Sequence, residues 1–197
     1  MNRRMLISAH HVLEESCEKY PDKICLEDKR EEITYEECSF RAKKIAALLS
    51  ETGVQAGERV GVYLDRSISQ VISIFGIWYS GAVLVVLNPI LNSDQLRHII
   101  KDASIKTIIS DDRFLLKKKD LFASAGIKKI VSFGDAVDMP GIETVQNLKG
   151  DYSVLPDMKK KNHGPGSDIS HIIYTSGSTG RPKGIVISHT NTINGAR

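Results

Sequence analysis

The 197-residue sequence has few cysteines, and none of them lies in a pattern typical of a metal site. Cys17, Cys25 and Cys38 are odd in number, show no C-x-x-C spacing and have no histidine partner that would suggest zinc. The chain also has no internal repeat. This pattern favours free thiols in a reducing compartment, and we therefore expect a cytoplasmic protein.

Aromatic residues are also scarce, at 6% of the chain, and none of them alternates with the lysine clusters. These clusters lie at Lys117–Lys119, Lys128–Lys129 and Lys159–Lys161. A surface that binds a nucleic-acid strand needs aromatic rings between its cations. With a net charge of +3, the clusters indicate solvated faces and a linker, with an anion-attracting surface as the alternative. We expect no nucleic-acid partner.

Long apolar runs are absent apart from one charge-free stretch, residues 67–93, which is long enough to resemble a membrane span. Its pattern favours a buried helix that leads into a buried strand. Helical spacing is interrupted at Gly81, Val83–Leu87 is rich in β-branched residues, and Pro89 ends the run. We therefore expect no membrane span. The short apolar run that ends at His10 is too short for a signal peptide.

Helical patterns alternate with short apolar runs along most of the chain, which is typical of an α/β protein with a mainly parallel sheet flanked by helices. Hydrophobic residues at 41% and charged residues at 26% fit a globular protein. We predict helices near Ala9–Lys19, Tyr35–Thr52, Ser67–Ser80, Ser93–Ala103 and Asp112–Ala125. We predict strands near Ile24–Glu27, Arg59–Leu64, Val83–Leu87, Thr107–Ser110 and Lys129–Ser132.

Three segments follow from these patterns. Residues 1–156 form the α/β unit, residues 157–168 form a linker, and residues 169–197 begin a further subdomain that is incomplete. The linker sequence, DMKKKNHGPGSD, has no apolar periodicity and contains two glycines and a proline. Beyond it, Ile169–Tyr174 and Ile185–Ser188 are predicted to be neighbouring strands with a glycine-rich loop between them.

Two threonines are placed to begin helices. Thr34 precedes the predicted helix Tyr35–Thr52 and is followed three residues later by Glu37, which is the spacing of a capping box. Gly53 then follows as a C-terminal stop. Thr190 is predicted to cap a last helix that begins at the next residue.

The segment 174–184, YTSGSTGRPKG, has the composition of a phosphate-binding loop. Within it, residues 175–183 combine four hydroxyl side chains, two glycines and one lysine: Thr175, Ser176, Ser178, Thr179, Gly177, Gly180 and Lys183. Glycines allow successive backbone N–H groups to point into one concavity, where they bind an anion. Hydroxyls add neutral donors and the lysine adds a mobile positive charge. Such a set suits a polyphosphate.

Two common phosphate-loop signatures do not fit this segment. A Walker A loop requires Gly-Lys followed by Ser or Thr, whereas Lys183 lies between Pro182 and Gly184. The dinucleotide fingerprint has a different glycine spacing and leads into a helix, whereas this loop leads into an apolar, β-branched run. The residues alone therefore predict phosphate binding of unknown type, with a purely structural loop as the alternative.

The eleven residues YTSGSTGRPKG resemble the signature of the adenylate-forming, or AMP-binding, superfamily. This superfamily contains acyl-CoA synthetases, non-ribosomal peptide adenylation domains and luciferase. Shorter segments agree with it along the chain, so that the likeness runs from about residue 7 to residue 195: 20–22, 33–37, 53–54, 57–60, 81–82 and 88–89.

The resemblance implies a two-step ligase. A carboxylate is joined to AMP with release of pyrophosphate, and the acyl group then passes to a thiol. ATP and Mg²⁺ are the implied ligands. The loop hydroxyls and the backbone at its glycines would hold the β- and γ-phosphates, and Lys183 would take the catalytic role of neutralising the departing pyrophosphate. No residue is predicted to be a metal ligand.

Two departures from the family pattern are interpreted as structural. Tyr79-Ser80-Gly81 stands where the family commonly has Lys-Ala-Gly, and Val86 where it often has Pro. They favour an acyl-CoA or acyl-carrier ligase over a peptide-synthetase adenylation domain. His189 follows an apolar strand and is interpreted as a packing or capping residue rather than a catalytic one.

Family members are much longer than this chain. The implied adenine-binding Tyr-Gly-x-Thr-Glu segment, ribose-binding Asp, hinge, acyl pocket and C-terminal domain with its catalytic Lys are not found in these residues. We therefore expect an N-terminal portion that is inactive alone. A degenerate or split-chain nucleotide-binding module that acts with a C-terminal partner polypeptide is the alternative. An unrelated phosphate-loop enzyme would need a complete catalytic set, which we do not find.

Overall fold

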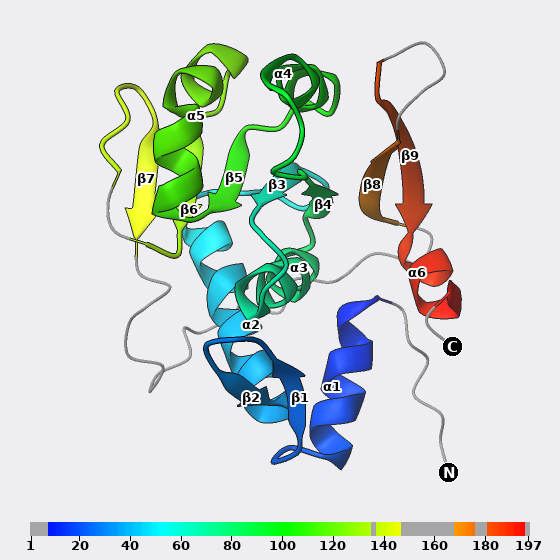
Figure 1. The fold of residues 1–197 in the computed structure, drawn as a ribbon. Coiled ribbons are helices and arrows are strands. Elements are labelled where there is room, and N and C mark those ends of the chain that lie inside the picture. Colours follow the sequence, from blue (N-terminus) through cyan, green and yellow to red (C-terminus); the bar gives the residue numbers. More distant parts are fainter. Residues whose placement is uncertain (1–7, 135–136, 147–167, 176–180, 196–197) are drawn as a thin grey trace.

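The computed structural model describes residues 8–134, 137–146, 168–175 and 181–195 (Figure 1). A seven-stranded sheet forms the centre, helices cover both of its faces, and two further strands pair separately. This arrangement confirms the predicted α/β class with a mainly parallel sheet flanked by helices. The predicted linker, residues 157–168, lies outside the described residues except for Asp168.

The five predicted helices are confirmed to within one residue at either end. The helices are α1 His10–Lys19, α2 Tyr35–Glu51, α3 Ile68–Ser80, α4 Ser93–Asp102, α5 Asp112–Ala125 and α6 His189–Gly195. Thr34 caps α2 as predicted, because its side chain accepts a hydrogen bond from the N–H of Glu37 at 3.2 Å. Gly53 follows α2 with a φ of +80°, a conformation that glycine adopts without steric cost.

The start of α6 corrects a prediction. The helix begins at His189, so Thr190 lies inside it and is not its N-cap. Ser188 takes that role, because its hydroxyl accepts a hydrogen bond from the N–H of Asn191 at 3.2 Å. The N–H of His189 is bound by the carbonyl of Asp168 at 3.0 Å, which fixes the turn.

The strands include two that the sequence patterns did not predict, β2 and β7. The strands are β1 Ile24–Glu27, β2 Glu32–Thr34, β3 Arg59–Tyr63, β4 Val83–Val86, β5 Thr107–Ser110, β6 Lys129–Ser132, β7 Glu143–Gln146, β8 Ile169–Thr175 and β9 Lys183–Ser188. β9 begins two residues earlier than predicted, because Lys183 and Gly184 pair with the end of β8. The predicted neighbouring strands on either side of the loop are confirmed.

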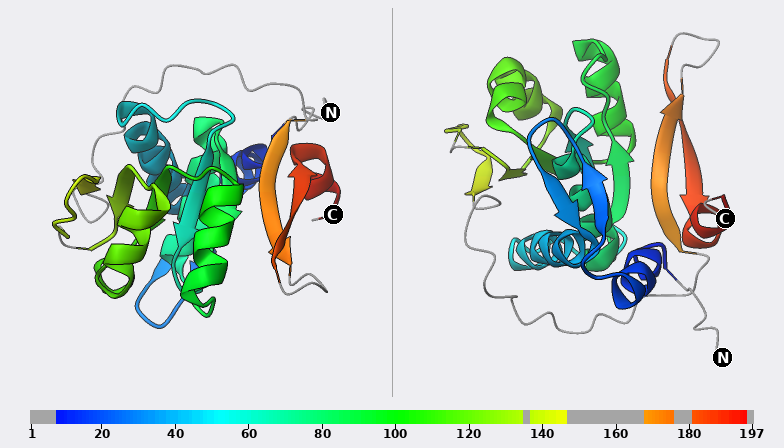
Figure 2. Two further views of the ribbon diagram at one scale, coloured as in Figure 1. Left: turned by 90° about the horizontal axis from the view of Figure 1, so that it is seen from above. Right: turned by 60° about the horizontal axis from the view of Figure 1, so that its bottom comes forward.

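The strand order in the large sheet is β7-β6-β5-β3-β4-β8-β9. All neighbours are parallel except β8 and β9, which form an antiparallel hairpin. The hairpin and α6 lie at one edge of the molecule in both views of Figure 2. The sheet therefore joins strands from the first and the third of the predicted segments. The boundary between these segments stays a prediction.

Two apolar cores lie on opposite faces of the sheet, because successive strand side chains point to opposite sides. Val60 and Val62 pack with α1, α2 and α3 in one core, whereas Tyr63 packs with α4 and α5 in the other. Ile108 and Ile109 divide between the cores in the same way. Figure 1 shows α2 and α3 on one side of the sheet and α4 and α5 on the other.

The charge-free stretch 67–93 forms α3 and β4, as predicted. Ile72 and Ile77 of α3 are almost fully buried, and so is Val85 of β4. Across the described ranges, no helix is long and apolar enough to cross a membrane.

The three cysteines carry free thiols, as predicted. They come from α1, β1 and α2, and Cys38 is buried whereas Cys17 and Cys25 are partly buried. Burial raises the pKa of the Cys25 and Cys38 thiols above the ordinary value. Because the thiolate is the reactive form, these two cysteines are poor nucleophiles at neutral pH.

We expect the contact between α2 and α3 to depend on Gly76. A Cβ atom at this position would lie 2.6 Å from Cβ of Ile45 and 2.9 Å from the carbonyl oxygen of Ala42. Gly76→Ala should lower the free energy of unfolding by about 1–3 kcal/mol, because the overpacking outweighs the better helix propensity of alanine. Urea unfolding measures this change. Gly195→Ala, which meets no atom within 4 Å, is the matched control and should be nearly neutral.

Candidate functional site

The strands of the β8–β9 hairpin hold the two ends of the predicted phosphate loop side by side. Thr175 pairs with Lys183, and Tyr174 pairs with Gly184. β8 runs parallel to β4, so the loop leaves β8 at the edge of the sheet where the parallel strands have their carboxyl ends. Ligands of open α/β sheets bind at this edge.

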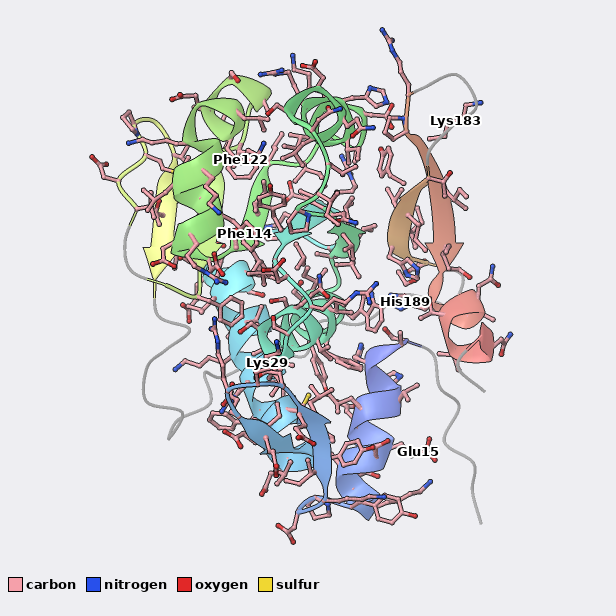
Figure 3. The ribbon with its side chains drawn as sticks, in the orientation of Figure 1. Glu15, Lys29, Phe114, Phe122, Lys183 and His189 are labelled. Atoms are coloured by element: carbon pink, nitrogen blue, oxygen red, sulfur yellow. The ribbon has the colours of Figure 1, made fainter. Side chains whose placement is uncertain are left out.

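The middle of the predicted loop lies outside the described residues. These are Ser176, Gly177, Ser178, Thr179 and Gly180, and their phosphate-binding role stays a prediction. The described ends are Thr175 and Lys183, which are both exposed. Figure 3 shows Lys183 at the loop end of the hairpin, with His189 at the opposite end of β9.

Tyr174 ties the loop to helix α4. Its hydroxyl donates a hydrogen bond to Oδ2 of Asp102, the last residue of α4, at 2.5 Å. Burial and the neighbouring carboxylate raise the pKa of Tyr174 above its ordinary value, so the hydroxyl remains a donor at neutral pH. The contact therefore fixes the first residue of the loop motif against a rigid helix.

Gly184 makes room for this tyrosine. A Cβ atom at Gly184 would lie 3.1 Å from Cζ of Tyr174 and 3.1 Å from Cγ2 of Ile172, which is tighter than ordinary van der Waals contact. The ring therefore packs closely over the glycine opposite it. The first and last residues of YTSGSTGRPKG thus close the loop together, which gives a structural reason for glycine at the end of the motif.

A second hydrogen bond joins α4 to the far end of the loop. Nε2 of His98 lies 3.0 Å from the carbonyl oxygen of Pro182 and must carry the ring proton to donate to it. Pro182 is buried, whereas Arg181 before it is exposed. Both ends of the loop are therefore attached to α4, at Asp102 and at His98.

A cavity of about 580 Å³ lies between α4 and the end of the loop. It is lined by Asp94, Gln95, Arg97, His98, Lys101, Asp102, Arg181 and Pro182. Arg97 pairs with Asp94 at 3.1 Å, and Asp102 accepts from Tyr174, so both carboxylates of the lining have partners. The cations Lys101 and Arg181 are exposed at this cavity.

The opposite end of the hairpin is held by buried polar contacts. Nε1 of Trp78 donates to the carbonyl of Ser170 at 3.0 Å, and the Ser170 hydroxyl lies 2.7 Å from the Thr192 hydroxyl. His171 lies 2.8 Å from the same serine hydroxyl, and burial lowers the pKa of His171 below its ordinary value. These contacts join α3, β8 and α6.

His189 has the packing role that the sequence predicted. Its ring is buried, and Nδ1 accepts a hydrogen bond from the N–H of Ala9 at 3.1 Å. Its ring also lies edge-on to Trp78, with centroids 6.3 Å apart. His189 therefore connects the start of α6 to the start of α1 and lies at the opposite end of β9 from the loop.

One group of potential metal ligands lies among the described residues. His10, His11 and Glu14 of α1 place ligand atoms within 4.8 Å of one another. The group is next to Ala9, which binds His189, and therefore lies at the opposite end of β9 from Lys183. It offers nothing to a metal ion bound at the phosphate loop.

The contacts of Tyr174 and Pro182 with α4 were not predicted from the sequence. Tyr174 and Asp102 are 72 residues apart, and no local pattern connects them. A weak signal was present, because the loop motif begins with an aromatic residue and ends with glycine. Cross-strand pairing makes these two residues neighbours.

Residues 13–197 match the AMP-binding enzyme family. The match covers most of the chain, and the protein therefore belongs to this family. The strands, the loop position and the motif agree with this membership.

Curated relatives include large synthases that match over nearly all of this chain. Zwittermicin A synthase ZmaJ of Bacillus cereus is 32% identical over 183 residues, which is 93% of this chain and 31% of that protein. Bacitracin synthase 3 of Bacillus licheniformis is 31% identical over 188 residues, which is 94% of this chain and 3% of that protein. The chain thus spans less than a third of either relative.

Solved structures show the same fold. The anthranilate CoA ligase AuaEII in complex with anthranoyl-AMP superposes with a TM-score of 0.82 and 26% identity, over 94% of this chain and 36% of that one. The luciferase-like enzyme from the mealworm Zophobas morio gives a TM-score of 0.77 and 25% identity, over 95% of this chain and 44% of that one.

We predict that the hydrogen bond between Tyr174 and Asp102 stabilises the hairpin. A double-mutant cycle with Tyr174→Phe and Asp102→Asn should give a coupling energy of about 1 kcal/mol, because Tyr174→Phe removes the donor and Asp102→Asn leaves a neutral, weaker acceptor. The cycle is needed because Asp102→Asn also removes a negative charge from the C-terminal end of α4, where it is unfavourable. Urea unfolding of the four proteins measures the coupling, and purely additive effects would contradict the assignment.

Proposed function

We propose that this chain is the N-terminal portion of an ATP-dependent, AMP-forming ligase that activates a carboxylate, and that residues 175–183 bind the phosphates of ATP. One observation carries the proposal. In a member of the AMP-binding family, the motif YTSGSTGRPKG is closed by the pairing of Tyr174 with Gly184 at the carboxyl edge of a parallel sheet. Hydroxyls, glycines and a lysine at that edge suit a polyphosphate.

Lys183 is the residue that we assign to charge neutralisation. In the first step, a carboxylate oxygen attacks the α-phosphorus of ATP, and the bond from that phosphorus to the β-phosphate oxygen breaks. The electron pair leaves with pyrophosphate, so negative charge grows on the leaving group. A lysine held at the end of β9, beside Thr175, supplies a preorganised positive charge there.

The loop residues also fit an ATP molecule that carries Mg²⁺. The described residues at the loop, Thr175 and Arg181 to Gly184, contribute no carboxylate. Mg²⁺ in nucleotide sites is held largely by phosphate oxygens and water, and few protein ligands are required. When bound, the ion neutralises phosphate charge, and the hydroxyls and Lys183 orient the same phosphates.

Two classes of carboxylate substrate are candidates. The departures from the family pattern at Tyr79-Ser80 and Val86 favour an acyl-CoA or acyl-carrier ligase, and the likeness to an anthranilate CoA ligase supports that assignment. The names of the curated relatives instead favour adenylation for peptide synthesis. Tyr79 and Ser80 are buried. Because such side chains act on packing, their departures carry less weight for substrate choice.

The division of the chain into two subdomains and a linker is also part of the proposal. We infer that residues 1–156 and 169–197 belong to successive subdomains joined by the linker 157–168, and that groups for adenine, ribose and the acyl chain lie on a polypeptide beyond this segment. A degenerate or split-chain nucleotide-binding module with a C-terminal partner is the alternative. The three free thiols support a reducing, cytoplasmic location.

We predict that the 197-residue chain binds ATP weakly and does not catalyse adenylation alone. Contacts with the phosphates alone should give a dissociation constant in the millimolar range, which corresponds to a binding free energy of about 4 kcal/mol. Catalysis should fail, because nothing in the predicted site positions a carboxylate in line with the α-phosphate. Carboxylate-dependent exchange between ATP and pyrophosphate, with fatty, aryl and amino acids, measures activity.

Two lysine variants test whether ATP binding depends on Lys183. Lys183→Ala should weaken ATP binding, whereas Lys128→Ala, an exposed lysine on a different loop, should leave it unchanged. Exchange by the chain alone that disappears in Lys183→Ala would show a complete site in these residues and contradict the proposal. Exchange that appears only with an added C-terminal polypeptide would establish the split-chain form.

A further inference from the structure

The polar side of helix α4 lies against the end of the predicted phosphate loop. Asp94, His98 and Asp102 are four residues apart, so they share one side of the helix. All three line the cavity that Arg181 and Pro182 border from the loop. The other side of α4 is anchored in the core by three aliphatic residues that are at most 1% exposed: Leu96, Ile99 and Ile100. Helix α4 therefore presents its polar side chains from a fixed position.

His98 lies in the middle of this polar side and binds the backbone directly before Lys183. Its Nε2 donates a hydrogen bond to the carbonyl oxygen of Pro182 at 3.0 Å. This oxygen belongs to the peptide group that joins Pro182 to Lys183. Because a peptide group is planar, its oxygen, its nitrogen and Cα of Lys183 move together. The hydrogen bond therefore acts on the position of Lys183.

The proline makes this attachment effective. The ring of Pro182 fixes the backbone torsion φ at about −65°. The peptide group that follows is planar, so ψ of Pro182 is the soft torsion that remains between the ring and Cα of Lys183. The direction of the carbonyl depends on ψ, and a hydrogen bond that holds the carbonyl also holds ψ. Pro182 is buried, so water competes less for the same carbonyl.

The other contact between α4 and the hairpin acts at a different place. Tyr174, whose hydroxyl binds Asp102, lies opposite Gly184 and precedes the loop. That contact fixes the strand that enters the loop, whereas His98 acts on the peptide group directly before Lys183. Strand pairing with Thr175 fixes Lys183 from the side of β8, and His98 fixes it from the side of the loop.

We propose that His98 is a positioning residue, which sets the orientation of Lys183 toward the phosphates through the carbonyl of Pro182. The inference rests on the proposed function, in which Lys183 neutralises the departing pyrophosphate. A lysine loses conformational freedom when it binds a phosphate, and a backbone that is already fixed reduces this loss. His98 does not touch the phosphates, and its effect reaches them through Lys183.

Protonation of His98 does not break this contact. The neutral ring donates from Nε2 when its proton lies there, and the imidazolium ion donates from the same atom. The orientation of Lys183 should therefore be the same on both sides of the His98 titration. A glutamine side chain also carries N–H donors and favours a helix, so His98→Gln keeps a donor on the same side of α4.

The first test uses the full 197-residue chain, labelled with nitrogen-15 and free of ligand. The amide signal of Lys183 reports on the peptide group that His98 holds. His98→Ala should shift this signal, and His98→Gln should return it toward its wild-type position. Lys101→Ala is the matched control, because Lys101 also lies on α4 and lines the same cavity, and this change should leave the signal unchanged.

The second test measures the affinity of each chain for inorganic pyrophosphate from the amide signals of residues 175–183. His98→Ala should weaken binding at least about threefold, and His98→Gln should restore it to within about twofold of the wild type. In a Lys183→Ala chain, adding His98→Ala should have no further effect, because His98 acts through Lys183. A role of His98 in general stability would weaken binding in both backgrounds.

Each outcome decides the inference. An unmoved Lys183 signal in His98→Ala, no recovery in His98→Gln, or additive losses in the double variant would overturn it. Signals of α2, on the other face of the sheet, verify that each variant folds. Position 98 is partly exposed and alanine favours a helix, so folding should be retained. A wild-type chain that binds no pyrophosphate would count against the proposed function, and the ligand-free signal would still decide whether His98 holds Lys183.

Discussion

The short pairing between β4 and β8 sets the position of the strand that leads into the predicted phosphate loop. Two residue pairs join these strands, Leu84 with His171 and Val85 with Ile172. This pairing is what places the hairpin parallel to the central strands and brings the end of β8 to the carboxyl edge of the sheet. A ladder of two residue pairs holds a hairpin weakly. Most of the stabilisation that fixes the hairpin must therefore come from side-chain contacts on the two faces of the hairpin.

Those contacts divide between the two ends of the hairpin. At the loop end, α4 holds Tyr174 and Pro182 from one face, through Asp102 and His98. At the other end, Trp78 and His189 hold the hairpin through buried hydrogen bonds. The loop is thus presented by anchored strands, while Thr175 and Lys183 remain exposed for a ligand. This division explains how one short element combines a fixed position with an accessible charge.

The two faces of the hairpin differ near the loop. Ile172 and Tyr174 of β8 pack against the core of α4 and α5, whereas Ile173 and Ile185 on the other face are about half exposed. An enzyme that joins ATP and a carboxylate must hold the two reactants in line.

Much of the fold followed from the sequence, because long periodic segments determine helices and β-branched runs determine buried strands. β2 and β7 were missed for a physical reason. Their sequences, EIT and ETVQ, are short and partly charged, and each is a strand only because a neighbour pairs with it. The role of Ser188 as the N-cap of α6 was also missed. Ser188 and Thr190 are two residues apart and both carry a hydroxyl, so the local sequence gave no basis for choosing Ser188 over Thr190.

The phosphate-binding role of the loop stays a prediction from its composition, whereas the contacts that support the loop ends could not be predicted. Hydroxyls, glycines and Lys183 indicate phosphate binding by composition alone. The bond between Tyr174 and Asp102 joins residues 72 positions apart, and it depends on the order of strands in the sheet. Sequence patterns describe neighbours along the chain, whereas this contact is a property of the assembled fold.

The central claim is that residues 175–183 bind the phosphates of ATP. Nitrogen–proton correlation NMR of the nitrogen-15-labelled chain tests this claim most directly. The chain is titrated separately with ATP, pyrophosphate and adenosine. We predict that ATP and pyrophosphate shift the amide signals of Gly177, Ser178, Gly180 and Lys183, and that adenosine leaves them unchanged. Shifts caused by adenosine alone, or phosphate-dependent shifts confined to α1 or α5, would contradict the account.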